Sequence, residues 1–253
     1  MGRIISVVNQ KGGVGKTTTA VNLAAGLGKA GKRTLLIDID PQGNSTSGYG
    51  INKRKIAVSS YDVLTNTAKL SAAIVKTPFE NVDIVPSNIA LAGAEIEMID
   101  FDNRESVLKS AIAPVFGDYD FIILDCPPSL GLITLNALTA SDTVLVPIQC
   151  EYFALEGLSQ LMATVRLVKQ RYNSVLELEG VLLTMFDGRL NLTQQVVNEV
   201  KQYFPRKVFT TTIPRTVRLS EAPSFGKPIQ YYDKSNKGAL AYDALAAEII
   251  KKA

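Results

Sequence analysis

The sequence of 253 residues contains no histidine and no tryptophan. Without histidine, the protein cannot form imidazole metal sites, histidine general bases or Ser-His-Asp triads. Any proton acceptor used in catalysis must therefore be a carboxylate, a lysine or a water molecule.

Cysteines and long apolar runs are also scarce. The two cysteines, Cys126 and Cys150, each end an apolar strand-like run, and such thiols are usually buried and reduced. No apolar run approaches the roughly 18–20 residues that a bilayer-spanning helix needs. The N-terminus reads as a strand leading into a functional loop. We therefore expect neither a signal nor a transit peptide, and we expect a cytoplasmic protein.

Length and composition fit one folded domain. Apolar residues make up 46% and charged residues 20% of the chain, and we expect residues 1–253 to form a single α/β domain. The net charge of +3 is unevenly distributed. Residues 1–150 carry 13 basic and 14 acidic side chains, whereas residues 151–253 carry 14 and 10. This modest basic bias is a weak indication of a polyanionic partner.

The most informative stretch is N-Q-K-G-G-V-G-K-T-T at residues 9–18. It lies between an apolar run at residues 4–8 and a helical pattern, which is the context of a phosphate-binding loop. The glycines allow backbone N–H groups to face a ligand at the positive end of the following helix. In this interpretation Lys16 reaches the outer phosphates and the Thr17 hydroxyl binds Mg²⁺.

The loop departs from the standard pattern. G-x-x-x-x-G-K-[ST] requires a glycine where this chain has Gln10, and a second lysine, Lys11, opens the loop. The residues alone indicate an additional cation beside the predicted phosphate site.

Acidic residues end or follow two predicted strands. Asp38 and Asp40 lie in I-D-I-D-P-Q-G-N, and Asp125 ends F-I-I-L-D. Ligands of parallel sheets bind at the carboxyl ends of strands, and an Asp closing an apolar strand is the Walker B pattern that holds Mg²⁺. We assign Asp40 to position or deprotonate the water molecule that attacks the bound phosphate. Asp38 either holds the neighbouring loop or binds a metal-bound water.

Strand-like runs alternate with helical patterns, which predicts a doubly wound, mainly parallel sheet flanked by helices. Gly31 is expected to cap the first helix, and Gly43–Ser60, rich in Gly, Asn, Ser and Lys, is expected to be flexible. The predicted strands cover residues 3–9, 33–38, 82–86, 121–125, 143–148, 180–185 and 207–213, and the predicted helices cover residues 17–30, 89–98, 104–113, 155–171, 193–204 and 239–250.

Five segments together resemble the ParA/Soj family of chromosome- and plasmid-partitioning ATPases. They are K-G-G-V-G-K-T-T, D-I-D-P-Q-G-N, F-I-I-L-D-C-P-P-S, Q-C-E-Y-F-A-L-E-G and I-P-R-T-V-R-L-S-E-A-P-S, and they span nearly the whole chain in matching order. The resemblance is strongest to the short chromosomal type, Soj. It implies a P-loop NTPase fold of the deviant Walker A type that binds ATP and Mg²⁺ and hydrolyses ATP.

The resemblance also implies roles for individual residues. Lys11 and Lys16 act in catalysis with Asp40, and Lys11 is the signature lysine that crosses to the nucleotide of the partner subunit. Mg²⁺ is held by Thr17, Asp125 and Asp40. The residues implied in phosphate contact are Lys11, Gly12, Gly13, Val14, Gly15, Lys16, Thr17 and Thr18.

The remaining implied contacts concern adenine and the dimer. The adenine is expected near Met185 and Pro214. Gly12 is expected to tolerate no side chain, because the loop of the partner subunit approaches closely there. The family forms a nucleotide-dependent homodimer with two ATP molecules between its subunits.

The resemblance further implies DNA and protein partners. The dimer binds double-stranded DNA without sequence preference, which places it on the nucleoid, and a ParB-type partner stimulates the hydrolysis that resets it. Arg189 and Arg218 match family positions implicated in DNA binding, and arginines in polar loops can contact phosphates without reading bases. The chain begins at a strand, with no helix-turn-helix extension before it, so we do not expect operator binding.

Three alternatives share parts of these motifs. A MinD-like membrane ATPase needs an amphipathic C-terminal helix with a basic face, whereas the alanine-rich tail here contains Asp243 and Glu248 and reads as a packing helix, so no membrane binding is expected. An iron–sulfur reductase ATPase of the nitrogenase iron-protein type needs two cluster cysteines, but Cys150 lacks the expected glycine-rich context. A non-hydrolysing nucleotide-gated scaffold is disfavoured by Asp40.

Overall fold

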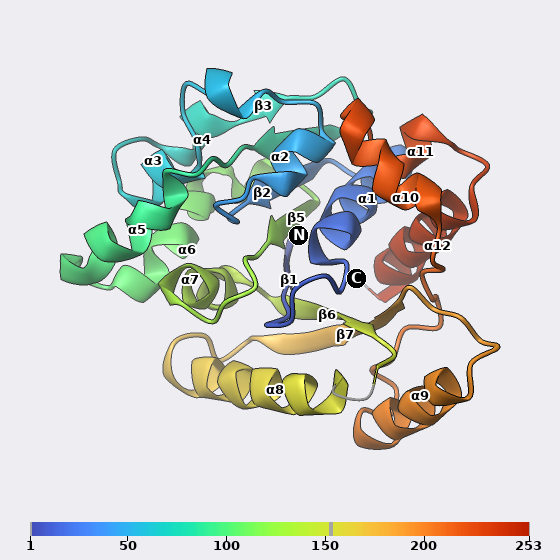
Figure 1. Cartoon of the computed structure of the whole chain (residues 1–253). Coiled ribbons are helices and arrows are strands. Elements are labelled where there is room, and N and C mark those ends of the chain that lie inside the picture. The colour runs from blue at the N-terminus through green and yellow to red at the C-terminus, as the bar shows by residue number, and fades with distance from the viewer. Residues whose placement is uncertain (1, 152–153, 253) are drawn as a thin grey trace.

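The computed structural model describes residues 2–151 and 154–252. Within them lies a seven-stranded sheet of order β3-β4-β2-β5-β1-β6-β7 (Figure 1). Its strand pairs are parallel except for the edge pair β3–β4, which confirms the predicted doubly wound, mainly parallel sheet. The strands are β1 (Arg3–Val7), β2 (Thr34–Asp38), β3 (Val75–Lys76), β4 (Val82–Val85), β5 (Phe121–Asp125), β6 (Thr143–Gln149) and β7 (Glu177–Thr184).

Helices connect most of these strands, and short 3₁₀ turns (η) join some of the helices. The α-helices are α1 (Lys16–Lys29), α2 (Asn44–Gly48), α3 (Ser60–Leu64), α4 (Leu70–Ala73), α5 (Leu91–Glu97), α6 (Val107–Ile112), α7 (Leu132–Ala140), α8 (Ala154–Arg171), α9 (Asn191–Tyr203), α10 (Val217–Glu221), α11 (Ile229–Tyr232) and α12 (Lys237–Lys252). The 3₁₀ turns are η1 (Lys53–Lys55), η2 (Met98–Asp100), η3 (Arg104–Ser106), η4 (Ala113–Asp118) and η5 (Ala222–Phe225).

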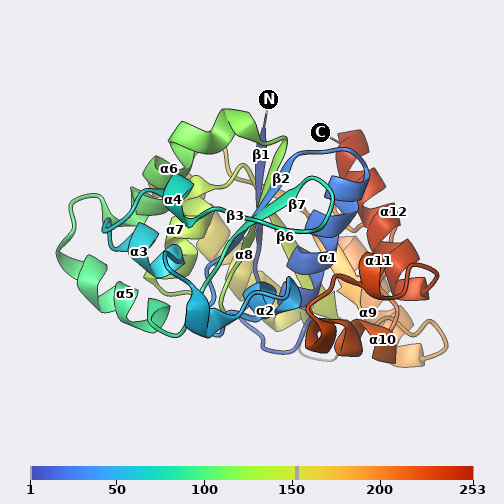
Figure 2. The same cartoon turned by 90° about the horizontal axis from the view of Figure 1, so that it is seen from above.

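The sheet separates two layers of helices (Figure 2). One apolar core joins the sheet to α5, α6, α7 and α8, and a second core joins its other face to α1, α11 and α12. Every residue of β2 and β5 is buried. Near-continuous apolar runs such as F-I-I-L arise because helices cover both faces of these strands.

The C-terminal helix α12 packs along α1. The hydroxyl groups of Tyr242 and Thr19 lie 3.2 Å apart, and Leu245 and Ile249 are also completely buried. The apolar face of α12 is therefore used inside the protein, as expected for a packing helix. Among the described residues, no helix combines the length and the apolar character that a membrane crossing requires.

Two sequence predictions about secondary structure were wrong. Residues 207–213 do not form a strand. They run beside β7 and hydrogen-bond to it at Val181 and Leu183, but this pairing forms an isolated bridge at Val208 and no continuous ladder. A further bridge joins Pro214 to Phe186, just beyond the end of β7. Helix α7 was not predicted, because its sequence L-I-T-L-N-A-L-T-A is apolar on nearly all sides and lacks a helical stripe.

The segment Gly43–Ser60 is also more ordered in structure than its composition suggested. It contains α2 and η1, and the side chains of Ser45 and Thr46 are fully buried. These polar residues bond to the carboxylates of the sheet edge described below, which gives this segment regular structure that its composition did not indicate. The predicted cap at Gly31 is confirmed, since this residue follows α1 with φ 79°.

Candidate functional site

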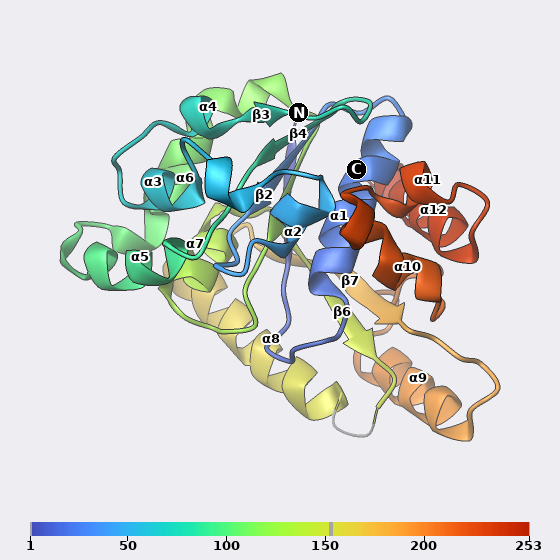
Figure 3. The same ribbon diagram turned by 45° about the horizontal axis from the view of Figure 1, so that its top comes forward.

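The predicted functional residues converge at one edge of the sheet. In the register of the central strands, Asp125 at the end of β5 lies between Val7 of β1 and Asp38 of β2. Because the three strands are parallel, the loop after β1 and the acids of β2 and β5 share the same edge. Figure 3 shows α2 lying between β2 and α1 at this edge.

The loop from β1 to α1 adopts the open conformation of a glycine-rich turn. Gly13 and Gly15 have φ of 76° and 86°, in the left-handed region that favours glycine, and α1 begins directly afterwards at Lys16. Apart from its two chain neighbours, a Cβ atom on Gly12 would meet no atom of the described residues within 4 Å. The side chain of Thr184 anchors the loop, since its hydroxyl donates to the Val14 carbonyl at 2.8 Å.

The two lysines of the loop have different environments. Lys16 is 7% exposed, and its Nζ donates to the Lys11 carbonyl at 3.0 Å. Burial lowers the pKa of Lys16, although the nearby Asp125 acts in the opposite direction. The side chain of Lys11 is 44% exposed and forms an ion pair with Glu151. Sequence reasoning missed Glu151, which lies far away in the chain.

Asp125 is completely buried and only partly hydrogen-bonded. Its Oδ2 accepts from the Ser45 hydroxyl at 2.8 Å, whereas its Oδ1 has no partner within the described chain. Burial raises the pKa of Asp125, and the neighbouring Asp38 raises it further, while the hydrogen bond from Ser45 and the nearby Thr17 hydroxyl act in the opposite direction. A buried carboxylate oxygen without a partner is costly unless a ligand satisfies it.

Asp38 holds the segment that contains α2. Its Oδ2 accepts both the backbone N–H of Thr46 at 2.8 Å and the Thr46 hydroxyl at 2.7 Å. Burial raises the pKa of Asp38 despite these hydrogen bonds. Of the two roles considered for Asp38, the geometry supports holding the neighbouring loop. Asp40 is 6% exposed and accepts the backbone N–H of Gln42 at 2.9 Å.

The oxygen groups at this edge suit Mg²⁺. Asp125, whose Oδ1 is unpartnered among the described residues, lies near the hydroxyl of Thr17 and the carboxylate of Asp40, and Mg²⁺ prefers such hard oxygen ligands. No cluster of three metal-ligating acids or thiols occurs among residues 2–151 and 154–252. A Mg²⁺ site does not require such a cluster, because this ion is usually bound by one or two carboxylates, and water and phosphate oxygens complete its coordination.

Two adjoining cavities of 150 and 320 Å³ extend from the loop, and both are lined by Thr18, Leu219 and Ser220. The smaller one also reaches Met185 and Pro214, so the structure brings these two predicted residues together with the loop. Gly15 and Thr18, predicted to contact phosphates, also line it, whereas sequence reasoning missed the remaining lining residues, although the I-P-R-T-V-R-L-S segment contains several of them. The full lining is Gly15, Thr18, Thr184, Met185, Ile213, Pro214, Arg215, Thr216, Leu219, Ser220 and Tyr242.

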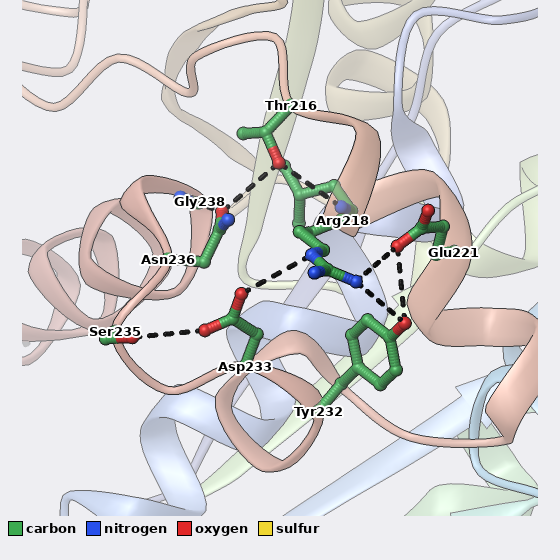
Figure 4. Close-up of polar contacts among 9 residues, drawn as sticks. Thr216, Arg218, Glu221, Tyr232, Asp233, Ser235, Asn236 and Gly238 are labelled. Carbon is green, nitrogen blue, oxygen red and sulfur yellow. Dashed lines mark hydrogen bonds and ion pairs between the residues drawn. The ribbon is translucent and has the colours of Figure 1, made fainter.

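Arg189 and Arg218 lie outside this site, and each is paired with acidic side chains. The Arg189 side chain is 89% exposed and donates to both oxygens of Asp187, at 2.8 and 2.6 Å. Arg218 lies between Glu221 at 3.0 Å and Asp233 at 3.7 Å (Figure 4). Both arginines are accessible, but a polyanion would have to replace their present partners.

The two cysteines lie within motifs of the sequence. Cys126 and Cys150 are free thiols, the first buried and the second half-buried, as expected. The Q-C-E-Y-F-A-L-E-G segment is described only in part, because residues 152 and 153 lie outside the described residues.

Comparison with known proteins identifies close relatives of this chain. Residues 2–178 match the AAA domain family. The chain is 59% identical to the sporulation initiation inhibitor protein Soj of Bacillus subtilis, covering 98% of both chains. It is 55% identical to the chromosome partitioning protein ParA of Myxococcus xanthus, covering 100% of this chain and 89% of that protein.

Solved structures share the fold over the full length. Cobyrinic acid a,c-diamide synthase of Mycobacterium smegmatis, solved with bound ADP and magnesium, is 40% identical and has a TM-score of 0.88, covering 99% of this chain and 95% of its own. The cell division ATPase MinD of Pyrococcus furiosus is 30% identical with a TM-score of 0.82, covering 100% of both chains. From its motifs, fold and relatives, this chain belongs to the AAA domain family and, within it, to the Soj/ParA chromosome-partitioning ATPases.

Proposed function

We propose that this partitioning ATPase is a nucleotide-controlled DNA-binding switch. ATP binding drives two copies to dimerise, the dimer binds double-stranded DNA without sequence preference on the nucleoid, and hydrolysis stimulated by a ParB-type partner returns it to a cytoplasmic monomer. The observation that carries the proposal is the single sheet edge shared by the glycine loop, buried Lys16 and the unpartnered oxygen of Asp125.

In this proposal the loop binds the phosphates of ATP. Backbone N–H groups of residues 12–18 and the positive end of α1 face the phosphates, and Lys16 supplies the charge. The burial of Lys16 strengthens its interaction with a polyanion, because less water screens the ammonium group. The base would occupy the cavity between Met185 and Pro214, whose walls come from four separate parts of the chain.

Thr17, Asp125 and Asp40 are the proposed residues at the Mg²⁺ position. When bound, Mg²⁺ would neutralise the charge of the β- and γ-phosphate oxygens. Asp40 is held through its Oδ1 by the Gln42 N–H, which leaves the other oxygen to orient the attacking water and accept its proton. Buried Asp125 would gain the partner that its Oδ1 lacks.

Lys11 is the proposed link between nucleotide binding and dimerisation. In the single chain its ammonium pairs with Glu151, and both side chains are nearly half exposed. Exposed ion pairs stabilise proteins by no more than about 1 kcal/mol. Lys11 can therefore exchange Glu151 for a phosphate held by a second copy at little cost. The open space beside Gly12 would admit the loop of that copy.

Arg189 and Arg218 would bind DNA in the same way, by exchanging their acidic partners within the chain for phosphates. Both arginines are exposed, and their pairing with Asp187, Glu221 and Asp233 would give way to DNA phosphates. Phosphate contacts of this kind position a protein on DNA without reading sequence. A MinD-like membrane role receives no support from α12, whose apolar face is buried against α1.

Retention of the protein on immobilised duplex DNA, measured together with phosphate release, tests the proposal. Wild type should be retained with ATP and Mg²⁺ but not with ADP. Asp40→Ala should be retained with ATP and release almost no phosphate. Equal retention with ADP and ATP, or a strong preference for one duplex sequence, would refute the proposed switch.

A further inference from the structure

Helix α5 and its flanking turns, residues 89–102, form a segment with two contrasting faces. The inner face contributes Leu91, Ala94 and Met98, all completely buried in the core. The outer face exposes two large apolar side chains to a similar degree, Ile89 at 71% and Ile96 at 72%. Isoleucine is rarely left so exposed in clusters unless another molecule covers it.

The outer face follows the spacing of a helix–helix contact. Ile89, Ala92, Ile96 and Ile99 are separated by three, four and three residues, which corresponds to positions a and d of two consecutive heptads. Ile99, which is 53% exposed, lies in η2, where 3₁₀ geometry aligns it with Ile96. These four residues are called the α5 outer face below.

Acidic residues border the α5 outer face. With Ile89 and Ile96 as a positions, Glu95 is at a g position and Asp100 at an e position, and Asp102 follows just after the extended Phe101 that ends the helical segment. Glu95 bonds to the Ile133 N–H, so Asp100 and Asp102 are the acids most available to a partner. Residues 89–106 contain five Asp and Glu but one Arg, in a chain whose net charge is +3. Among the described residues, neither Asp100 nor Asp102 forms an ion pair.

The charge decides which molecule can cover this face. A second copy would bring like charges together at the flanking positions, and DNA or an anionic membrane would be repelled. A helix with apolar a and d positions and lysine or arginine beside them would match both the isoleucines and the acids. We infer that the α5 outer face is the docking surface for a basic amphipathic helix of a partner protein.

Docking at this face would act on the sheet edge through two contacts. Ser87, just before α5, donates its N–H at 2.8 Å to the Thr46 hydroxyl, which in turn bonds to Asp38. On the other side, Glu95 accepts the N–H of Ile133 at 3.1 Å, at the start of α7 and after Asp125. A helix bound to α5 thus touches an element tied through Thr46 to Asp38 of β2 and through Glu95 to α7, the helix that follows β5. The assignment of this helix to the partner that stimulates hydrolysis rests on the proposed function.

The α5 segment is also accessible in the whole chain. Figures 1 and 3 place α5 at the outer left end of the molecule, away from α10, α11 and α12. A partner helix could therefore reach it without displacing the elements around the glycine loop.

The binding claim can be tested on the full chain without nucleotide or DNA. The probe is a fluorescently labelled two-heptad peptide with leucine at a and d and lysine at e and g, and its control carries glutamate at e and g. By fluorescence anisotropy, wild type should bind the lysine peptide and not the glutamate peptide. Ile96→Ser should weaken binding about tenfold or more, since burial of one isoleucine is worth at least that factor.

Two further variants distinguish binding at the α5 outer face from non-specific hydrophobic binding of the peptide. Leu240→Ser removes a comparably exposed apolar side chain from α12, 58% exposed, and should bind like wild type. Asp100→Lys with Asp102→Lys should prefer the glutamate peptide. The inference is overturned if wild type binds neither peptide, if Ile96→Ser binds the lysine peptide as tightly as wild type, or if the charge-reversed variant keeps the original preference. ATP-dependent DNA retention of Ile96→Ser, measured separately, reports on the proposed switch itself.

Discussion

Replacing Asp125 by asparagine should stabilise the metal-free protein at alkaline pH while abolishing ATP hydrolysis. Asp125 is completely buried, and its Oδ1 lacks a hydrogen-bond partner among the described residues. Asparagine has nearly the same shape and retains an oxygen that can accept from Ser45, but it carries no charge. The substitution therefore removes the electrostatic cost of the site together with its proposed metal ligand.

The sign of this effect follows from the raised pKa of Asp125. Burial raises the pKa of this carboxyl, so the folded state holds its proton more tightly than the unfolded state does. The stability contributed by the protonated form is complete at low pH and is lost as the pH rises from the ordinary aspartate range through the raised pKa. Each pKa unit corresponds to about 1.4 kcal/mol. At pH 8 we expect Asp125→Asn to gain on the order of 1–3 kcal/mol, with a smaller gain at pH 5.

Urea denaturation without Mg²⁺ and nucleotide, at both pH values, measures this difference as the free energy of unfolding. Asp118→Asn is the matched control, because Asp118 is exposed and its replacement should change stability little. The reasoning fails if Asp125→Asn is less stable than wild type at pH 8, or if the difference between the two proteins is the same at both pH values.

Other predictions concern the lysines and the proposed DNA contacts. Lys16→Ala should lose measurable ATP binding in a titration with a fluorescent ATP analogue, and retained affinity would contradict the loop assignment. Lys11→Ala should change the free energy of unfolding by less than about 1 kcal/mol. The same variant should lose partner-stimulated phosphate release, and unchanged release would remove Lys11 from the mechanism. Arg189→Glu should weaken ATP-dependent DNA retention, and Lys109→Glu on α6 should not. Wild-type retention should also fall steeply with salt as counterions are released, so salt-insensitive binding would argue against phosphate contacts.

The central strands and the glycine loop were predictable because their signals are local. F-I-I-L-D, for example, carries both the buried strand and its terminal acid within five residues, and parallel topology then brings strand ends together. Helix α7 was not predictable in this way, since a helix buried on most sides shows no apolar stripe. Residues 207–213 have strand-like composition and hydrogen-bond to β7 at Val181 and Leu183, yet this pairing amounts to an isolated bridge at Val208 and not to a continuous ladder.

Long-range partners were the least predictable part of the site. Ser45 and Thr46 lie in a segment whose Gly, Asn and Ser content is typical of flexible loops, but they bond to Asp125 and Asp38. Glu151 pairs with Lys11 across most of the length of the chain. Such pairs depend on which strands are neighbours, and no local pattern in either segment encodes that.

The central claim is that ATP joins two copies of this chain, and light scattering on Asp40→Ala tests it most directly. With saturating ATP and Mg²⁺, the account predicts a molar mass near twice that of the 27.3 kDa chain, returning to that of a single chain when ADP replaces ATP. A mass of one chain under both conditions would contradict the account.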